Sequence, residues 1–477
     1  MVFSSLFFVF FFLVLNLLVY NYVDGIEKKN KVMLIFSLIF YSWAGPKYLI
    51  LLLGMVFISW FCAIKIEQSK HRQLKKRYMV LACVLLIVLL GIFKYLNFFT
   101  GITSSLIGLP SEATKIVLPV GISFYTFQLL SYVIDVYRGE VAAQRKYWHL
   151  LLYAALFHQC IAGPIVRYQL VADEIEHRKV RIDEFSKGIM RFTIGLAKKA
   201  ILANSCAAVA DTLFPTGHKE ILAVPAGGLW IGLLFYMLQI YLDFSAYSDM
   251  AIGMGWMIGF HYNENFNYPY IAASIKDFWN RWHISLSTFF RDYVYIPLGG
   301  NRKGPKRRTI NLFIVWALTG FWHGASWNYI FWGLYFFVFI CIENRGWLQK
   351  LKTLPGIVGH AYAMVVVYFG WALFRQESVV SLGASLKGML GLNGNGFMDM
   401  STSIMIKNNI FLLIFCIIAS TPLIKYIGMF FRGLVNRICK IPYITYVYEM
   451  VAPIILLALS FMALIGNSYN PFLYFQF

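Results

Sequence analysis

The sequence predicts an all-α integral membrane protein with about 11 to 13 spanning or partly spanning helices around a central funnel or tunnel. Apolar residues make up 59% of the 477 positions and charged residues only 13%, so the polar side chains are too few to cover a soluble globule. Several apolar runs are close to the ~20 residues that a helix needs to cross the hydrocarbon core. The clearest runs cover residues 3–23, 48–66, 78–99 and 446–466.

The basic residues predict the topology of these helices. The net charge of +20 comes from short segments between apolar runs, which is typical of cytoplasmic loops rather than of a nucleic-acid-binding face. Segments 24–31, 65–77, 301–308 and 425–440 are therefore expected in the cytoplasm. Both termini are then expected on the extracytoplasmic side. We expect the first run to stay as a helix, because no Lys or Arg precedes it as in a signal peptide.

We expect one membrane domain over residues 1–477, built in three parts. Residues 1–146 form N-terminal helices, among them a hairpin of 32–44 and 48–66. Residues 147–345 form the core, where Gly, Pro and charges interrupt the apolar stretches. Irregular backbone at membrane depth is tolerated where it lines a cavity, so a cavity is predicted there. Residues 346–477 hold the C-terminal helices. In order from the core onward, helices are expected at 309–322, 326–342, 358–374, 409–427 and 446–466, with an amphipathic piece at 378–391.

Several chemistries are excluded by missing motifs. The chain has no GxxxxGK[ST] for ATP hydrolysis, no HExxH zinc motif and no GxSxG elbow. Its seven cysteines are scattered without a CxxC, so we expect neither disulfides nor a metal site. Three classes of protein remain: a transporter, a scaffold, and an enzyme whose chemistry depends on histidine.

The stretch "IKDFWNRWHISLSTFFRDYVYIPLGGNRKG", residues 275–304, holds the densest set of polar groups. Asn280 and His283 are three residues apart, so on a helix they would share a face, flanked by Trp279 and Trp282. A functional site and a helix at the membrane surface are both compatible with this pattern.

A second histidine, His323, ends the apolar helix expected from Thr309 in "LTGFWHGASWNYIFWG". At 1.5 Å per residue it would lie ~21 Å from the cytoplasmic end, where an isolated imidazole is costly. Gly320 and Gly324 bracket it and would let another segment or a substrate approach the ring. The alternative is a histidine hydrogen-bonded between helices.

Acidic residues in "YLDFSAYSDMAIGMG" form a third candidate group. Asp243 and Asp249 could belong to a proton or ion path. Alternatively, they pair with Arg281 or Arg291 and hold the shape of the cavity.

At these residues the sequence resembles the membrane-bound O-acyltransferase (MBOAT) superfamily, and within it the bacterial alginate O-acetyltransferase type. The matching stretches follow the family's order over nearly the whole chain. They are "MVFSSLFF", "LPVGISFYTFQLLSYVIDVYRG", "AGPIVRY", "YLDFSAYSDMAIG", "NFNYPYIAASIKDFWNRWHISLSTFFRDYVYIPLGGNRKG" and "TGFWHGASWNYIFWG". One departure is visible, because the family commonly has Phe-Pro where this chain has Phe157-His158.

The resemblance implies an acyltransferase in which His323 is the near-invariant histidine and His283 the second one. It implies that an acetyl group passes from cytoplasmic acetyl-CoA, a substrate rather than a resident cofactor, through the membrane toward a polysaccharide. Imidazole suits this role because it can act as a general base near neutral pH. The residues expected to bind substrate or line the tunnel are Trp279, Asn280, Trp282, Arg291, Asp292, Trp322 and Asp243.

The C-terminal stretch "NPFLYFQF", residues 470–477, is the last candidate. Related proteins are thought to relay the acyl group through a tyrosine in a short Phe-rich motif, which corresponds here to Tyr474. An extracytoplasmic partner transferase would then place the group on the polymer. The alternative is that the phenylalanines only anchor the terminus in the membrane interface.

The expected protein is thus a multi-pass enzyme of the bacterial cytoplasmic membrane that acetylates an alginate-like exopolysaccharide, cellulose or peptidoglycan. Three alternatives stay open: D-alanyl transfer to teichoic acid by the same fold, a polysaccharide or lipid exporter, and a scaffold.

Overall fold

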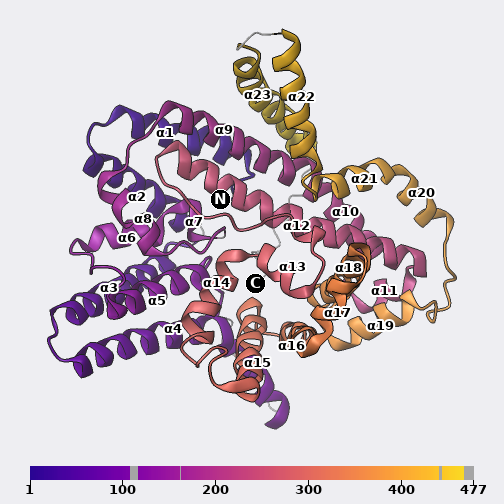
Figure 1. Cartoon of the computed structure of the whole chain (residues 1–477), viewed down its shortest axis with the longest axis horizontal. Helices are drawn as coiled ribbons and strands as arrows, with labels where there is room; N and C mark the ends of the chain where they lie inside the picture. The colour runs from indigo at the N-terminus through magenta and orange to yellow at the C-terminus, as the bar shows by residue number, and fades with distance from the viewer. Residues whose placement is uncertain (44, 108–115, 162, 440–442, 467–477) are drawn as a thin grey trace. The chain divides into compact units, whose positions relative to one another are not determined.

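The computed structural model describes residues 1–43, 45–107, 116–161, 163–439 and 443–466 (Figure 1). Every regular element in this part of the chain is a helix, which confirms the all-α prediction. The chain divides into two compact units. Unit 1 consists of Met1–Ile189, Met250–Glu264 and Thr288–Ile296, and unit 2 of Met190–Asp249, Asn265–Ser287 and Pro297–Phe477.

Unit 1 contains the N-terminal helices. They are η1 (Phe8–Phe12), α1 (Leu13–Tyr22), α2 (Ile26–Ser42), α3 (Lys47–Gln68), α4 (Arg72–Ile107), α5 (Ile122–Arg138), α6 (Tyr147–Ala155), α7 (Phe157–Cys160), α8 (Tyr168–His177) and η4 (Arg291–Tyr295). The helices α3, α4 and α5 pack against one another. Helix α5 is buried along nearly its whole length, so it forms the centre of this group.

The Phe157-His158 site lies at a break between two helices of unit 1. Leu156 has non-helical backbone angles (φ −52°, ψ 115°) and separates α6 from α7, so the helix is interrupted here without a proline. His158 is buried, and its Nδ1 lies 3.4 Å from the Tyr262 hydroxyl. A break in the helix is therefore present in this chain although His158 stands where the resemblance leads one to expect proline.

Unit 2 contains most of the remaining helices. They are η2 (Lys198–Ala203), α10 (Asn204–Leu213), α11 (His218–Ala223), η3 (Pro269–Ile271), α13 (Ile275–Arg281), α15 (Gly304–His323), α16 (Trp327–Ile342), η5 (Glu343–Trp347), α17 (Leu348–Thr353), α18 (Gly356–Arg375), α19 (Val379–Met389), α20 (Met400–Asn408), α21 (Ile410–Ala419), α22 (Leu423–Cys439) and α23 (Tyr443–Gly466). Helices α9 (Ile182–Ala197), α12 (Ala226–Met257) and α14 (Ile284–Phe290) contribute residues to both units.

Helices α15 and α16 form a close hairpin because glycines lie where they meet. A Cβ atom on Gly320 would lie 2.4 Å from the Tyr329 carbonyl oxygen, and one on Gly333 would lie 2.3 Å from the Trp316 carbonyl oxygen. Real Cβ atoms do not approach backbone oxygen so closely, so only glycine permits this packing. The hairpin holds the end of α15, and thus His323, against α16.

Five helices in the described part of the chain are long and apolar enough to cross a membrane. They are Lys47–Gln68, Arg72–Ser104, Ile182–Leu213, Ala226–Met257 and Gly356–Arg375. A sixth span is formed if the pair α20 and α21, bent by 50°, counts as one. These are fewer than the 11 to 13 crossings expected, which included partial ones, so that number stays a prediction.

Two predicted helices differ in the structure. The run 3–23 is helical in its C-terminal part, where η1 and α1 follow each other over Phe8–Tyr22. The helix expected at 409–427 is wrong, because α21 ends at Ala419 and α22 begins only at Leu423. Pro422 explains the interruption, since proline disfavours the helical conformation of the residue before it.

Replacing Gly333 with alanine tests the α15–α16 packing. The added methyl group would press on the Trp316 carbonyl, and overpacking of this kind costs about 1–3 kcal/mol. We expect a clear fall in the thermal unfolding midpoint of the detergent-purified protein. The matched control is Gly383→Ala in α19, where a Cβ meets no atom within 4 Å. Equal midpoints for Gly333→Ala and the wild type would show that the packing is looser than described.

Candidate functional site

His323 is the last residue of α15 and lies inside an aromatic cluster of unit 2. Its side chain is buried, and its ring centroid lies 4.9 Å from that of Trp332 and 5.2 Å from that of Phe374. Helix α15 begins at Gly304, five residues earlier than expected, so its 20 residues carry His323 roughly 30 Å along the axis. The imidazole is therefore held far from the basic end of its helix.

The space beside the two glycines near His323 is filled by another part of the chain. The space beside Gly320 is taken by the Tyr329 carbonyl, and a Cβ on Gly324 would lie 2.3 Å from the Tyr329 ring. The segment that approaches here is thus α16. Of the two possibilities expected from the sequence, another segment of the chain is the one observed.

His283 lies between helices, so the prediction that it shares a helical face with Asn280 is wrong. Helix α13 ends at Arg281, Trp282 is extended, and His283 has φ 43° in the left-handed region. This break turns the two side chains into different environments. Asn280 is exposed, whereas His283 is 1% exposed.

The ring of Trp322 lies between the two histidines in a chain of ring contacts. The centroid of His283 is 5.9 Å from that of Trp322, and Trp322 is 4.9 Å from His323. On its other side, His283 meets Phe244 of α12 edge-on at 4.7 Å. The structure therefore brings together both predicted histidines and one predicted tryptophan, from α15 and the α13–α14 connection, with Phe244 of α12 beside them.

The other two predicted tryptophans are buried around this centre. Trp279 packs on Trp316 and Phe336, with centroid distances of 4.9 Å in each case. Trp282 packs on Trp371 of α18 at 4.7 Å. Such offset and edge-on contacts fix ring positions, so the two tryptophans hold α13 against the hairpin and α18.

Glu343 anchors the start of α13 and was not predicted. Its buried carboxylate accepts hydrogen bonds from the backbone N–H groups of Ile275 (2.6 Å) and Lys276 (3.0 Å). Ser274 caps the same end by accepting from the Asp277 N–H at 3.0 Å. A negative group at a helix N-terminus is favourable. The only sequence signal was an acidic residue directly after an apolar run.

Asn265 and Ser285 also escaped prediction, although both lie in the quoted motif stretch. The Asn265 side chain is fully buried, and its Oδ1 lies 3.2 Å from Nδ1 of His283 and 2.9 Å from Oγ of Ser285. An asparagine among aromatic residues could have indicated a buried amide, and a buried amide needs hydrogen-bond partners.

The buried aspartates of α12 pair with lysine and arginine of the preceding helical run. Asp243 lies 2.8 Å from Lys199, and both side chains are only 3% exposed. Asp249 pairs with Arg191 at 2.7 Å and with Lys198 at 2.5 Å. The predicted pairing with Arg281 or Arg291 is wrong, because Arg281 bonds to Asp277 at 2.9 Å and Arg291 to Asp292. Paired charges of this kind shape the structure.

Arg291 and Asp292 belong to unit 1, where they form an ion-pair network. The Asp292 carboxylate lies 2.6 Å from Arg291 and 2.6 Å from Arg167. Burial alone would raise the pKa of Asp292, but hydrogen bonds from the two arginines outweigh it and hold the pKa below its usual value. Their expected role in lining a tunnel stays a prediction.

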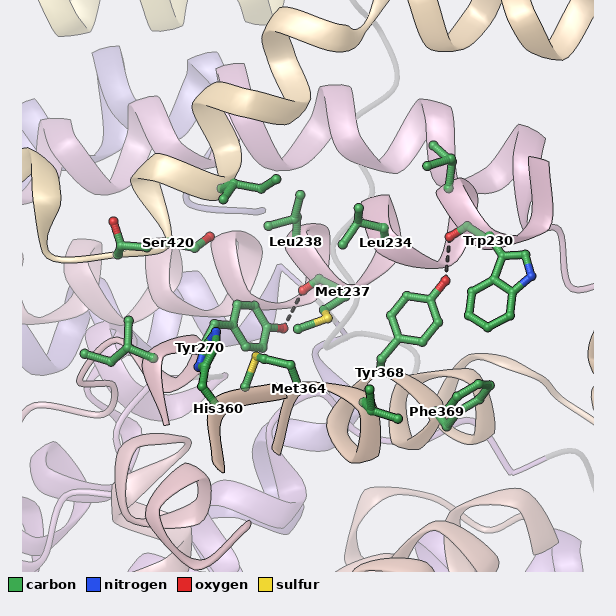
Figure 2. Close-up of a pocket in the computed structure, with 15 residues that line it drawn as sticks. Trp230, Leu234, Met237, Leu238, Tyr270, His360, Met364, Tyr368, Phe369 and Ser420 are labelled. Carbon is green, nitrogen blue, oxygen red and sulfur yellow. Dashed lines mark hydrogen bonds between the residues drawn. The ribbon is translucent and has the colours of Figure 1, made fainter. Parts of the chain in front are cut away.

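A cavity of about 690 Å³ lies in unit 2 among α12, α18 and α21 (Figure 2). Its wall is mostly apolar, and the hydroxyls of Tyr270 and Tyr368 donate to the carbonyls of Met237 and Trp230, each at 2.5 Å. His360 lines it, but none of the predicted site residues does. The central funnel therefore stays a prediction, and this cavity is a separate apolar groove.

Tyr474 and the rest of segment 470–477 lie outside the described residues, so their predicted role is untested by the geometry. Within residues 1–466, as far as they are described, no three His, Cys, Asp or Glu side chains gather as a metal site would need. The chemistry available at the centre is that of two buried imidazoles, which can accept and donate protons.

Comparisons with known proteins identify the family of this chain. Residues 140–374 match the family model described as MBOAT, membrane-bound O-acyltransferase family. The protein named "Probable alginate O-acetylase AlgI" from Pseudomonas putida is 36% identical over the full length of both chains. Its namesake from Pseudomonas aeruginosa is 40% identical over 80% of this chain and 73% of its own. The peptidoglycan O-acetyltransferase of Helicobacter pylori is 30% identical over 100% of this chain and 98% of its own. The chain therefore belongs to the membrane-bound O-acyltransferase family and is a multi-pass membrane acyltransferase.

Proposed function

We propose that this protein transfers acetyl groups to a polysaccharide of the cell envelope or of the secreted matrix. Two of its relatives are named for alginate and one for peptidoglycan, and all three for acetyl transfer. The observation that carries the proposal is the pair of buried imidazoles joined through Trp322, because acetyl transfer to a hydroxyl needs a general base. The acceptor class, alginate-like exopolysaccharide or peptidoglycan, follows from the relatives alone.

The donor in this proposal is acetyl-CoA from the cytoplasm. Its thioester carbonyl would lie beside His323, which is held by α15 and α16 within the aromatic cluster. Water is excluded from such a cluster, and this protects a reactive thioester from hydrolysis.

The Tyr474 hydroxyl is the first acceptor that we propose. His323 takes the phenolic proton as the oxygen attacks the thioester carbon. The new C–O bond forms, the C–S bond breaks, and the proton passes from His323 to the departing thiolate, giving CoA–SH and an acetyl-tyrosine ester. An extracytoplasmic partner transferase then moves the acetyl group to the polymer. This sequence requires the C-terminus to lie on the outer side of the cytoplasmic membrane, as the charge pattern predicts.

Two alternative functions can be distinguished from acetyl transfer, one by the donor and one by the effect of removing the His323 imidazole. D-alanyl transfer to teichoic acid would use a carrier-bound alanine in place of acetyl-CoA. An exporter would keep its activity when the imidazole of His323 is removed, because conduction needs no general base.

Replacing His323 with glutamine tests the general base. Glutamine keeps a polar side chain of similar reach but cannot take up a proton, so we expect acetyl transfer to fall by about 10²-fold or more. Transfer is measured as radiolabelled acetyl incorporated into polymer by membranes of equal protein content. His360→Gln, at the apolar groove, is the matched control and should keep full activity. Equal rates for His323→Gln and the wild type would refute the role of His323 and favour a transport or scaffold function.

Replacing Tyr474 with phenylalanine tests the relay. Loss of one hydroxyl oxygen leaves the aromatic segment intact, so we expect polymer acetylation to disappear while the protein accumulates normally. Tyr469→Phe, five residues earlier and directly before this segment, is the control and should acetylate normally. Full polymer acetylation by the Tyr474→Phe protein would show that the acetyl group passes directly to its final acceptor.

A further inference from the structure

Asn265 holds His283 through both its backbone and its side chain. The Asn265 carbonyl accepts the N–H of Ile284 at 3.0 Å, and its side-chain Oδ1 accepts the N–H of Ser285 at 3.3 Å. These bonds hold the two residues that directly follow His283, whose φ of 43° is unfavourable for a residue with a Cβ. The unusual backbone of His283 is thus stabilised by a fully buried asparagine 18 positions earlier.

The same contacts identify the oxygen of the Asn265 amide. The Ser285 backbone N–H can only donate, so the atom facing it must be an acceptor. The opposite end of the amide, Nδ2, lies 3.2 Å from Oγ of Ser248 and donates to it. The contacts at both ends of the Asn265 amide are therefore compatible with the same orientation, with Oδ1 toward Ser285 and Nδ2 toward Ser248.

This orientation determines where the proton of His283 lies. Nδ1 of His283 is 3.2 Å from Asn265 Oδ1, an atom that carries no hydrogen, so the hydrogen of this bond must be on Nδ1. A ring that is 1% exposed and packed against Phe244 and Trp322 favours the neutral form, because removing a charged imidazole from water is costly. A neutral imidazole with hydrogen on Nδ1 has a lone pair on Nε2.

We propose that Asn265 is a positioning residue that fixes His283 as the Nδ1–H tautomer, so that Nε2 accepts a hydrogen bond from the attacking hydroxyl. This inference rests on the proposed function and assigns the two histidines different tasks. His283 cannot donate to the thioester carbonyl in this form. It orients the hydroxyl, while His323 takes the proton.

Three variants separate this role from a structural one. Asn265→Leu removes the hydrogen-bond acceptor but keeps a side chain of similar volume. We expect kcat for acetyl transfer to fall by about 10- to 100-fold, as for other residues that orient a functional imidazole. The KM for acetyl-CoA should be unchanged. Asn265→Asp keeps the oxygen that faces His283 and should recover most of the activity. Asn267→Leu, at an exposed asparagine two positions later, should match the wild type. Thermal unfolding midpoints confirm that each variant is folded.

An unchanged kcat for Asn265→Leu would overturn the proposal. So would a loss in Asn265→Asp equal to that in Asn265→Leu, since the acceptor oxygen would then be irrelevant. A raised KM for acetyl-CoA in Asn265→Leu would also contradict it, because His283 would then contact the donor.

The tautomer itself can be read without turnover. Nitrogen NMR of protein labelled at its histidines, with His283→Gln to identify the signal, should show hydrogen on Nδ1 and none on Nε2. In Asn265→Leu this preference should be lost. Hydrogen on Nε2 in the wild type would overturn the proposal. A wild type without any acetyl transfer would refute the proposed function instead, whereas the NMR result would still decide what Asn265 does.

Discussion

The close approach of α15 and α16 is the constraint on which the candidate site depends. Gly320 and Gly333 let each helix pack on the backbone of the other, and a methyl group at either position would overlap a carbonyl oxygen. This contact places His323 beside Trp332 of the second helix. The carboxylate of Glu343, just after α16, then holds the first N–H groups of α13. The helix pair thus positions both His323 and the segment that leads to His283.

Several polar groups buried in unit 2 have specific partners, and this changes how they are interpreted. Asp243 and Lys199 form an ion pair whose members are both almost inaccessible, which is costly unless the partner is in place. Asn265 joins Ser248 of α12 to the loop of His283. The polar residues of α12 therefore connect helices, and a chain of acidic residues for ion conduction is not needed to explain them. This supports an enzyme over an exporter.

Sequence reasoning predicted the elements that depend on local composition and missed those that depend on distant contacts. Helices α3 and α16 begin and end within two residues of the expected bounds, because apolar runs flanked by charge define them directly. The prediction that Asn280 and His283 share a helical face was wrong because a helical spacing of three was assumed across a backbone break after Arg281. The partner of Asp243 could not be predicted, since Lys199 lies 44 positions earlier and their contact depends on the packing of two long helices. The two histidines could be selected as candidates from their motifs. Their shared ring contact with Trp322 is visible only in the structure.

The proposed mechanism requires the thioester carbonyl of the donor to lie beside His323. An experimental structure of the protein with an unreactive thioether analogue of acetyl-CoA tests it most directly. This mechanism predicts that the acetyl group lies within about 4 Å of the His323 imidazole. An acetyl group bound elsewhere, with neither imidazole within reach, would contradict it.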